Sequence, residues 1–158
     1  MCGDLGAHDG QKTMTNSIYK ITDLYPFLTV NIDGRTAHVN DDVTFYTGNN
    51  AYPFHNVTFP KGFKTDWASV PRIVWAVYPP EGRYSAAAVL HDRLYTMGEI
   101  ERDRCDEAFY IAMRESGVSW ITANIFYQAV HLFAEPYFNS KSEAGNLTEI
   151  REDVCQRG

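Results

Sequence analysis

The chain has 158 residues, of which 44% are hydrophobic, 22% charged and 14% aromatic. This length and balance predict one folded domain with its own apolar core. The formal net charge of -6 argues against sequence-independent binding along a nucleic-acid backbone, which requires a basic surface.

The cysteines and the N-terminal segment limit the compartment that we expect. Cys2, Cys105 and Cys155 are widely spaced and form neither a disulfide framework nor a C-x-x-C metal site. Free thiols of this kind are typical of a reduced, intracellular protein. The opening MCGDLGAHDG lacks the apolar segment of a signal peptide, and no apolar run of about 18 residues predicts a membrane span.

Short β-prone segments alternate with turn signals up to about residue 70. We expect strands at 18–21, 27–32, 43–46 and 57–59. Asp33-Gly34 is typical of a hairpin turn, and residues 47–50 of a loop. Together these segments predict a small antiparallel sheet.

After residue 70 the apolar period becomes helical. Ser69 is a natural cap for a short helix that begins near Pro71 and ends at Pro79. Longer helices follow, each closed by a glycine or a proline: 84–97, 101–116 and 119–135. Their short connections make them antiparallel neighbours.

These elements predict an α+β protein in which a small N-terminal antiparallel sheet packs on a C-terminal antiparallel helical hairpin or three-helix unit. The single domain is expected over residues 17–140, with the sheet at 17–63 and the helices at 70–136. A flexible arm at 1–16 and a polar tail at 141–158 flank it.

One histidine and one aspartate lie on the apolar faces of neighbouring helices. His91 lies on the apolar stripe of helix 84–97, and Asp106 on that of helix 101–116. A buried carboxylate is costly without a partner, so we expect the two side chains to meet. Such a pair fixes the imidazole tautomer and raises its basicity, as a general base requires. A core His–Asp pair without chemistry is the alternative.

Two further carboxylates can reach the same cleft. Asp92 follows His91 by about 100° around the helix and can line the edge of the cleft. Asp66 lies in a polar segment that leads into the helices. Carboxylates in this position suit a hard cation with oxygen ligands.

The remaining polar candidates are expected to play supporting roles. Ser69 and Arg72 are natural capping and ion-pairing residues, and Arg83 lies in the turn that precedes helix 84–97. Ser69 could nominally complete a Ser-His-Asp set, but no G-x-S-x-G elbow surrounds it. Cys105 is expected to be a buried, inert thiol, and His131 to lie on a solvated face.

Three motifs resemble an uncharacterised family encoded by bacteriophages and prophages. They are G-F-K-T-D-W-A-S-V-P-R (62–72), G-R-Y-S-A-A-A-V-L-H-D-R-L-Y (82–95) and C-D-E-A-F (105–109), which contain F-x-T-D-x-A-S-x-P-R and H-D-x-L-Y. The resemblance implies a viral or prophage origin and leaves the function open.

H-D-R-L-Y (91–95) followed by C-D-E-A-F is also similar to the catalytic core of phospholipases A2. That resemblance implies His91 as the base for water, Asp92 as a calcium ligand, Asp106 as the orienting carboxylate and Tyr95 as a supporting hydroxyl. The chain lacks the glycine-rich calcium loop and the disulfide framework of the secreted enzymes, so calcium binding is the part of the analogy with least support.

Two classes of function stay open. The first is a phage-associated hydrolase that activates water against an ester (lipid) or a cell-wall bond, with calcium or another divalent metal at Asp92 and Asp66. The second is a non-catalytic virion component or accessory protein that binds a host or viral protein through aromatics such as Tyr46, Tyr52 and Phe54. If the protein is an enzyme, we expect the His91 ring to line an open pocket. If it is a binding protein, we expect the ring to be sealed from solvent. Either class fits the host cytoplasm or the virion.

Overall fold

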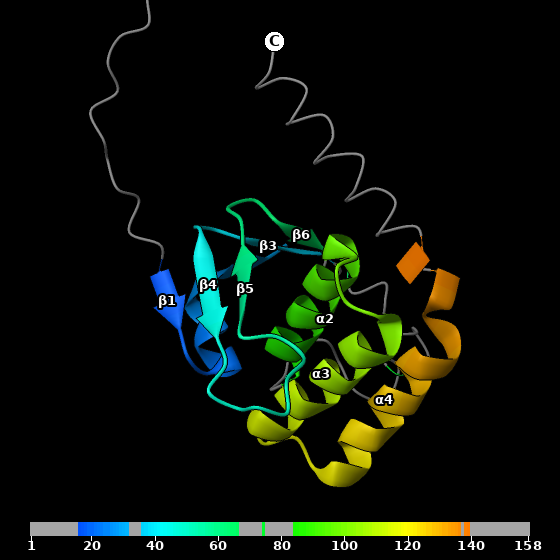
Figure 1. Ribbon diagram of the computed structural model, residues 1–158. Coiled ribbons are helices and arrows are strands. Elements are labelled where there is room, and N and C mark those ends of the chain that lie inside the picture. The colour runs from blue at the N-terminus through cyan, green and yellow to red at the C-terminus, as the bar shows by residue number, and fades with distance from the viewer. Residues whose placement is uncertain (1–15, 32–35, 67–73, 75–83, 137, 140–158) are drawn as a thin grey trace, which may run out of the picture.

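The computed structural model describes residues 16–31, 36–66, 74, 84–136 and 138–139. Within them, short strands precede three long helices, so the expected α+β class is confirmed (Figure 1). The elements are β1 Asn16–Ile18, the 3-10 helix η1 Ile21–Phe27, β2 Leu28–Val30, β3 Ala37–Val39, β4 Val43–Tyr46, β5 Asn56–Phe59, β6 Lys64–Thr65, α2 Ser85–Met97, α3 Arg102–Glu115 and α4 Trp120–Phe133.

The strands form two sheets where the sequence predicts one. The first has the order β1-β4-β5 and the second β2-β3-β6. β4 and β5 pair antiparallel as expected, with Val43 opposite Phe59, whereas β1 runs parallel to β4. β3 and β6 are too short for a period-2 pattern to stand out, and this is why the sequence did not indicate them.

The 3-10 helix η1 is the reason for the second sheet. The expected strand 18–21 ends at Ile18, because Ile21 begins η1, and Ile21 and Leu24 bury their side chains in the core. Residues three positions apart lie on the same face of a 3-10 helix, so both side chains can enter the core. The helix redirects the chain, so that β2 pairs with β3 rather than with β1.

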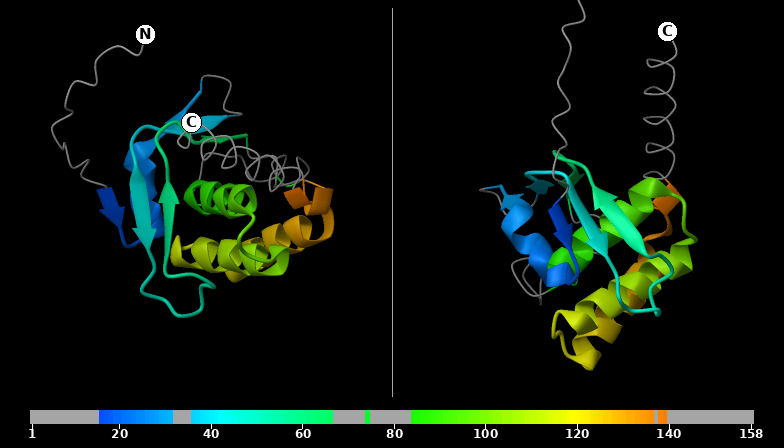
Figure 2. Two further views of the ribbon diagram at one scale, coloured as in Figure 1. Left: turned by 45° about the horizontal axis from the view of Figure 1, so that its top comes forward. Right: turned by 60° about the vertical axis from the view of Figure 1, so that its left-hand side comes forward.

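Helix α2 lies at the centre of the molecule, between the strands and the other helices (Figures 1 and 2). It contacts η1 and β6 on one side and α3 on the other. Consecutive residues from Ser85 to Asp92 are buried, as expected of a helix covered on all sides. Ala86, Ala87 and Ala88 are small enough to let these neighbours approach closely.

Helices α2, α3 and α4 have nearly the bounds that the sequence predicts. Gly98 ends α2 in the left-handed region, with φ at 65°. The Ser119 hydroxyl caps α4 by accepting a hydrogen bond from the backbone N–H of Thr122. None of the described helices is long and apolar enough to cross a membrane.

Several expected features fall outside the described residues. They are the Asp33-Gly34 turn, the capping of the short helix near Pro71, the arm before Asn16 and the tail at 141–158. Val74 alone of that short helix is described, and it is helical and buried.

Gly62 offers a test of backbone conformation that is free of steric clashes. Gly62 lies in the turn between β5 and β6 with φ at +81°, and Gly48 has no positive φ; a Cβ added at either position meets no atom within 4 Å. We predict that Gly62→Ala lowers the free energy of unfolding by about 1 kcal/mol, because L-residues disfavour positive φ. Gly48→Ala should stay within about 0.5 kcal/mol of the wild type in urea unfolding. Equal changes in the free energy of unfolding for the two variants would contradict the role given to the positive φ of Gly62.

Candidate functional site

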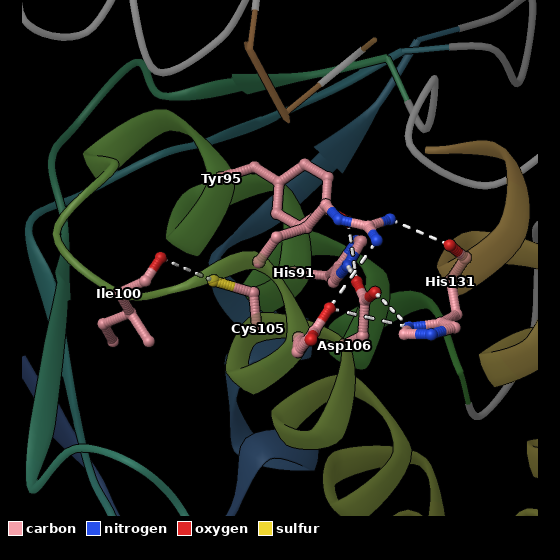
Figure 3. Close-up of polar contacts among 8 residues, drawn as sticks. His91, Tyr95, Ile100, Cys105, Asp106 and His131 are labelled. Carbon is pink, nitrogen blue, oxygen red and sulfur yellow. Dashed lines mark hydrogen bonds and ion pairs between the residues drawn. The ribbon is translucent and has the colours of Figure 1, made fainter. Parts of the chain in front are cut away.

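His91 and Asp106 meet in the core, as the sequence predicts. The Nε2 atom of His91, on α2, lies 2.8 Å from Oδ1 of Asp106, on α3, and both side chains are fully buried (Figure 3). Because a carboxylate can only accept, Nε2 donates, and in the neutral ring Nδ1 carries the lone pair. The pairing thus selects the tautomer that a general base at Nδ1 requires.

Tyr95 completes the network from one turn further along α2. Its hydroxyl donates to the same Asp106 Oδ1 at 2.6 Å. Burial, followed by the charge of Asp106 and the hydrogen bond to it, raises the pKa of Tyr95 far above its usual value. The phenol therefore stays protonated and remains a donor at all physiological pH values.

The His91 ring is enclosed by aromatic groups. Its centroid lies 4.1 Å from that of Tyr95 and 4.9 Å from that of Phe109. The ring is 0% exposed, which is the sealed arrangement and not the open pocket that an enzyme predicts. Its Nδ1 atom is buried and has no hydrogen-bond partner among the residues that the structure describes. Buried polar atoms without a partner are rare in native proteins and call for an explanation.

Asp92 is buried rather than at the edge of a cleft. Its carboxylate accepts a short hydrogen bond from the hydroxyl of Thr65, on β6. Thr65 and the exposed Asp66 line a surface groove of about 480 Å³. Asp92 therefore lies behind Thr65, with Asp66 on the outer side of the same strand end.

The structure does not describe the three residues that were predicted to support the site. Ser69, Arg72 and Arg83 all lie outside the described residues. Their roles stay predictions.

His131 is a member of the network that the sequence did not reveal. It is expected on a solvated face of helix 119–135, but it is only 35% exposed, and its Nδ1 lies 3.4 Å from Oδ2 of Asp106 (Figure 3). Tyr127 stacks on its ring at 5.6 Å. The solvated face was predicted because Asn124, Gln128 and Glu135 lie on the same helical stripe as His131. The one signal against it was the expected packing of this helix on helix 101–116.

Cys105 precedes Asp106 and fits the expectation of an inert thiol. It is 0% exposed, and burial, followed by the charge of Asp106, raises the pKa of its thiol to about 12. A thiol in this state is a poor nucleophile and a poor metal ligand. The chemistry of this region therefore belongs to nitrogen and oxygen groups.

Fold and site together define a class of protein: an α+β domain built around a buried Tyr–Asp–His network that bridges two antiparallel helices. The family described as "Protein of unknown function (DUF1353)" matches residues 38–130. That is more than half of the chain, and the chain belongs to this family. The matched region contains His91, Asp92, Tyr95 and Asp106.

A further comparison finds a relative with a partial match. "Uncharacterized protein y4jT" of Sinorhizobium fredii is 34% identical over 73 residues, which cover 45% of this chain and 22% of that protein. The match therefore spans less than a quarter of the relative. No solved structure matches the chain.

The buried network predicts a difference between two aspartates of α3. Asp106→Asn should lower the free energy of unfolding by about 1–3 kcal/mol, because it disturbs hydrogen bonds from His91 and Tyr95 to a buried charge. Asp103, which is 67% exposed, is the matched control, and Asp103→Asn should change stability by less than about 0.5 kcal/mol. Urea unfolding of both variants measures the difference. A neutral Asp106→Asn would mean that the network adds no stability.

Proposed function

We propose that the chain is a hydrolase in which His91 is the general base that activates water. The observation that carries the proposal is the state of the His91 ring: Nε2 is held by Asp106, and Nδ1 has no hydrogen-bond partner within the described part of the chain. A purely structural histidine gains stability by pairing both nitrogens. A ring with one oriented and one unpaired nitrogen is the form that base catalysis uses.

The proton transfers follow from this geometry. Nδ1 takes a proton from water while the water oxygen bonds to the carbonyl carbon of an ester. Asp106 stabilises the imidazolium that forms, and the Tyr95 hydroxyl holds Asp106 in place. The bond from the carbonyl carbon to the leaving oxygen then breaks, and the proton on Nδ1 passes to that oxygen.

Asp92 and Asp66 are the residues proposed to hold a divalent cation. Asp92 accepts a hydrogen bond from Thr65, and Thr65 and Asp66 line the same surface groove, so a cation bound there would meet oxygen ligands only, which suits calcium. A bound cation in this position would supply electrostatic stabilisation of the developing oxyanion. The protein's own contribution is to keep the Asp92 carboxylate oriented through Thr65.

Access to His91 is a requirement of this proposal. The ring is 0% exposed, so turnover needs a conformation in which Nδ1 meets water and the scissile carbonyl. Movements that open a site on binding are common in enzymes that exclude water.

The substrate class follows from the likeness to phospholipases A2 and from the motifs that resemble phage proteins. We propose a phage or prophage origin and an ester of a lipid as the substrate, with a cell-wall bond as the second choice. The host cytoplasm or the virion would be the place of action.

A second candidate is a non-catalytic phage protein that binds a host or viral protein. The sealed His91 ring favours it. The contact surface expected for it is only partly present: Tyr46 is exposed as predicted, whereas Tyr52 is only 5% exposed and donates to Glu115. Exposed apolar side chains gather instead on α4, at Trp120, Ile121, Ile125, Leu132 and Phe133.

Hydrolysis of lipid vesicles separates the two candidates. We predict that the full chain releases fatty acid from phosphatidylglycerol vesicles, and that His91→Gln lowers kcat by roughly 10²–10⁴-fold, the usual contribution of a general base. His55→Gln, at an exposed histidine outside the network, should keep full activity. Titration of released acid measures both.

The wild type alone can overturn the hydrolase proposal. Should it release nothing from lipid vesicles or from purified peptidoglycan, the binding candidate stands, whatever the variants do. A circular dichroism melt shows whether His91→Gln is folded, so that lost activity is not mistaken for lost structure.

Calcium binding is tested separately by calorimetry. The wild type should bind calcium, and Asp92→Asn or the exposed Asp66→Asn should weaken the affinity by about tenfold or more. Asp23→Asn, at an exposed aspartate in η1, is the control. The absence of heat in the wild type would remove the metal from the proposed mechanism and leave His91 as a base without it.

A further inference from the structure

Asp103, Asp106 and His131 place two oxygens and one nitrogen around a common point. One ligand atom from each of the three lies within 4.8 Å of the other two. Asp103 and Asp106 are three positions apart on one face of α3, and His131 faces them from α4. None of the three was predicted as a metal ligand from the sequence.

Two of these ligand atoms have no hydrogen-bond partner in the described residues. They are Oδ2 of Asp106, whose side chain is fully buried, and Nδ1 of His131. The two atoms face each other at 3.4 Å, longer than the usual 2.7–3.2 Å N–H···O hydrogen bond. An unpaired buried oxygen beside an unpaired imidazole nitrogen is unfavourable. An ion bound between the two atoms would pair both of them.

The spacing fits a tetrahedral metal ion. Two ligands that each lie about 2.1 Å from zinc at the tetrahedral angle are separated by about 3.4 Å. Oδ2 of Asp106 and Nδ1 of His131 have this separation, and Oδ1 of Asp103 lies 3.8 Å from the same Nδ1. Asp103 is 67% exposed, so its side chain is free to close the small remaining distance.

Contacts with Tyr127 and Arg102 hold His131 in place, and the Asp103 side chain is exposed to solvent. Tyr127 stacks on the His131 ring with an angle of 14° between the planes. Arg102 donates to the backbone carbonyl of His131 at 2.8 Å and so ties α3 to α4. Its guanidinium also lies 3.6 Å from Asp103 Oδ1, a contact that metal binding would replace. Asp103 and His131 are partly exposed, so the cluster lies at the edge of the core, although Oδ2 of Asp106 and Nδ1 of His131 are themselves buried.

We propose that Asp103, Asp106 and His131 bind a divalent transition metal, with zinc as the best fit. A nitrogen and two carboxylate oxygens suit zinc better than calcium, which takes oxygen ligands only. Asp106 would then link the metal through Oδ2 to His91 through Oδ1. This site is distinct from the calcium site proposed at Asp92 and Asp66, and it does not depend on the hydrolase proposal.

Calorimetric titration of the full chain with zinc chloride tests the site. We expect the wild type to bind one zinc ion that His131→Ala loses, and Asp103→Asn to weaken the affinity by at least about 100-fold, the upper range for loss of an outer-sphere partner. His55→Ala and Asp92→Asn are controls that should keep this ion, the first as a histidine outside the cluster and the second as the proposed calcium ligand. None of the variants changes a cysteine, so any zinc bound by cysteine thiols contributes equally to every titration.

The result that overturns the proposal is a zinc stoichiometry and affinity that His131→Ala and Asp103→Asn leave unchanged. Loss of the same ion in Asp92→Asn but not in His131→Ala would also overturn it and would assign the metal to Asp92. Because zinc binding is measured without a substrate, an inactive protein that binds zinc through His131 separates this proposal from the hydrolase proposal.

Discussion

The buried negative charge of Asp106 is the constraint on which the centre of this protein depends. A lone carboxylate in a core is strongly unfavourable, so its partners must be in place whenever the chain is folded. Two of them come from α2, the His91 imidazole and the Tyr95 hydroxyl, and both donate to Oδ1. The charge therefore fixes the position of α2 relative to α3 along the helix axes. Apolar packing alone specifies this position less strictly.

The same carboxylate faces two environments. Oδ1 is saturated by α2, whereas Oδ2 points toward His131 on α4 and has no hydrogen bond. The three buried side-chain atoms without a partner among the described residues are His91 Nδ1, Asp106 Oδ2 and His131 Nδ1, and all belong to this one network. Local departures from full pairing concentrate where a protein has a function, and here they lie on both sides of a single residue.

Neighbouring residues of α2 serve different parts of the fold. His91 turns toward α3, while Asp92 accepts from Thr65 of β6 and so ties the helix to the second sheet. In this way α2 connects strands and helices through two buried acidic contacts, one on each side. The proposed base and the proposed calcium ligand are adjacent in sequence but lie in separate environments. A single substrate carbonyl can therefore meet both groups only in an opened conformation, the same change that access to the buried His91 ring requires.

The sequence by itself determined the helices, their caps and the contact between His91 and Asp106, because these follow from a regular apolar period and from the cost of an unpaired buried charge. It did not determine the two sheets, because a 3-10 helix begins at Ile21, where the sequence predicts a strand, and because β6 is only two residues long. It also predicted a solvated face for His131, because polar residues share its helical stripe. Only the packing of α4 against α3 decided that this imidazole faces Asp106, because contacts between elements depend on how faces are arranged in space and not on the composition of either helix.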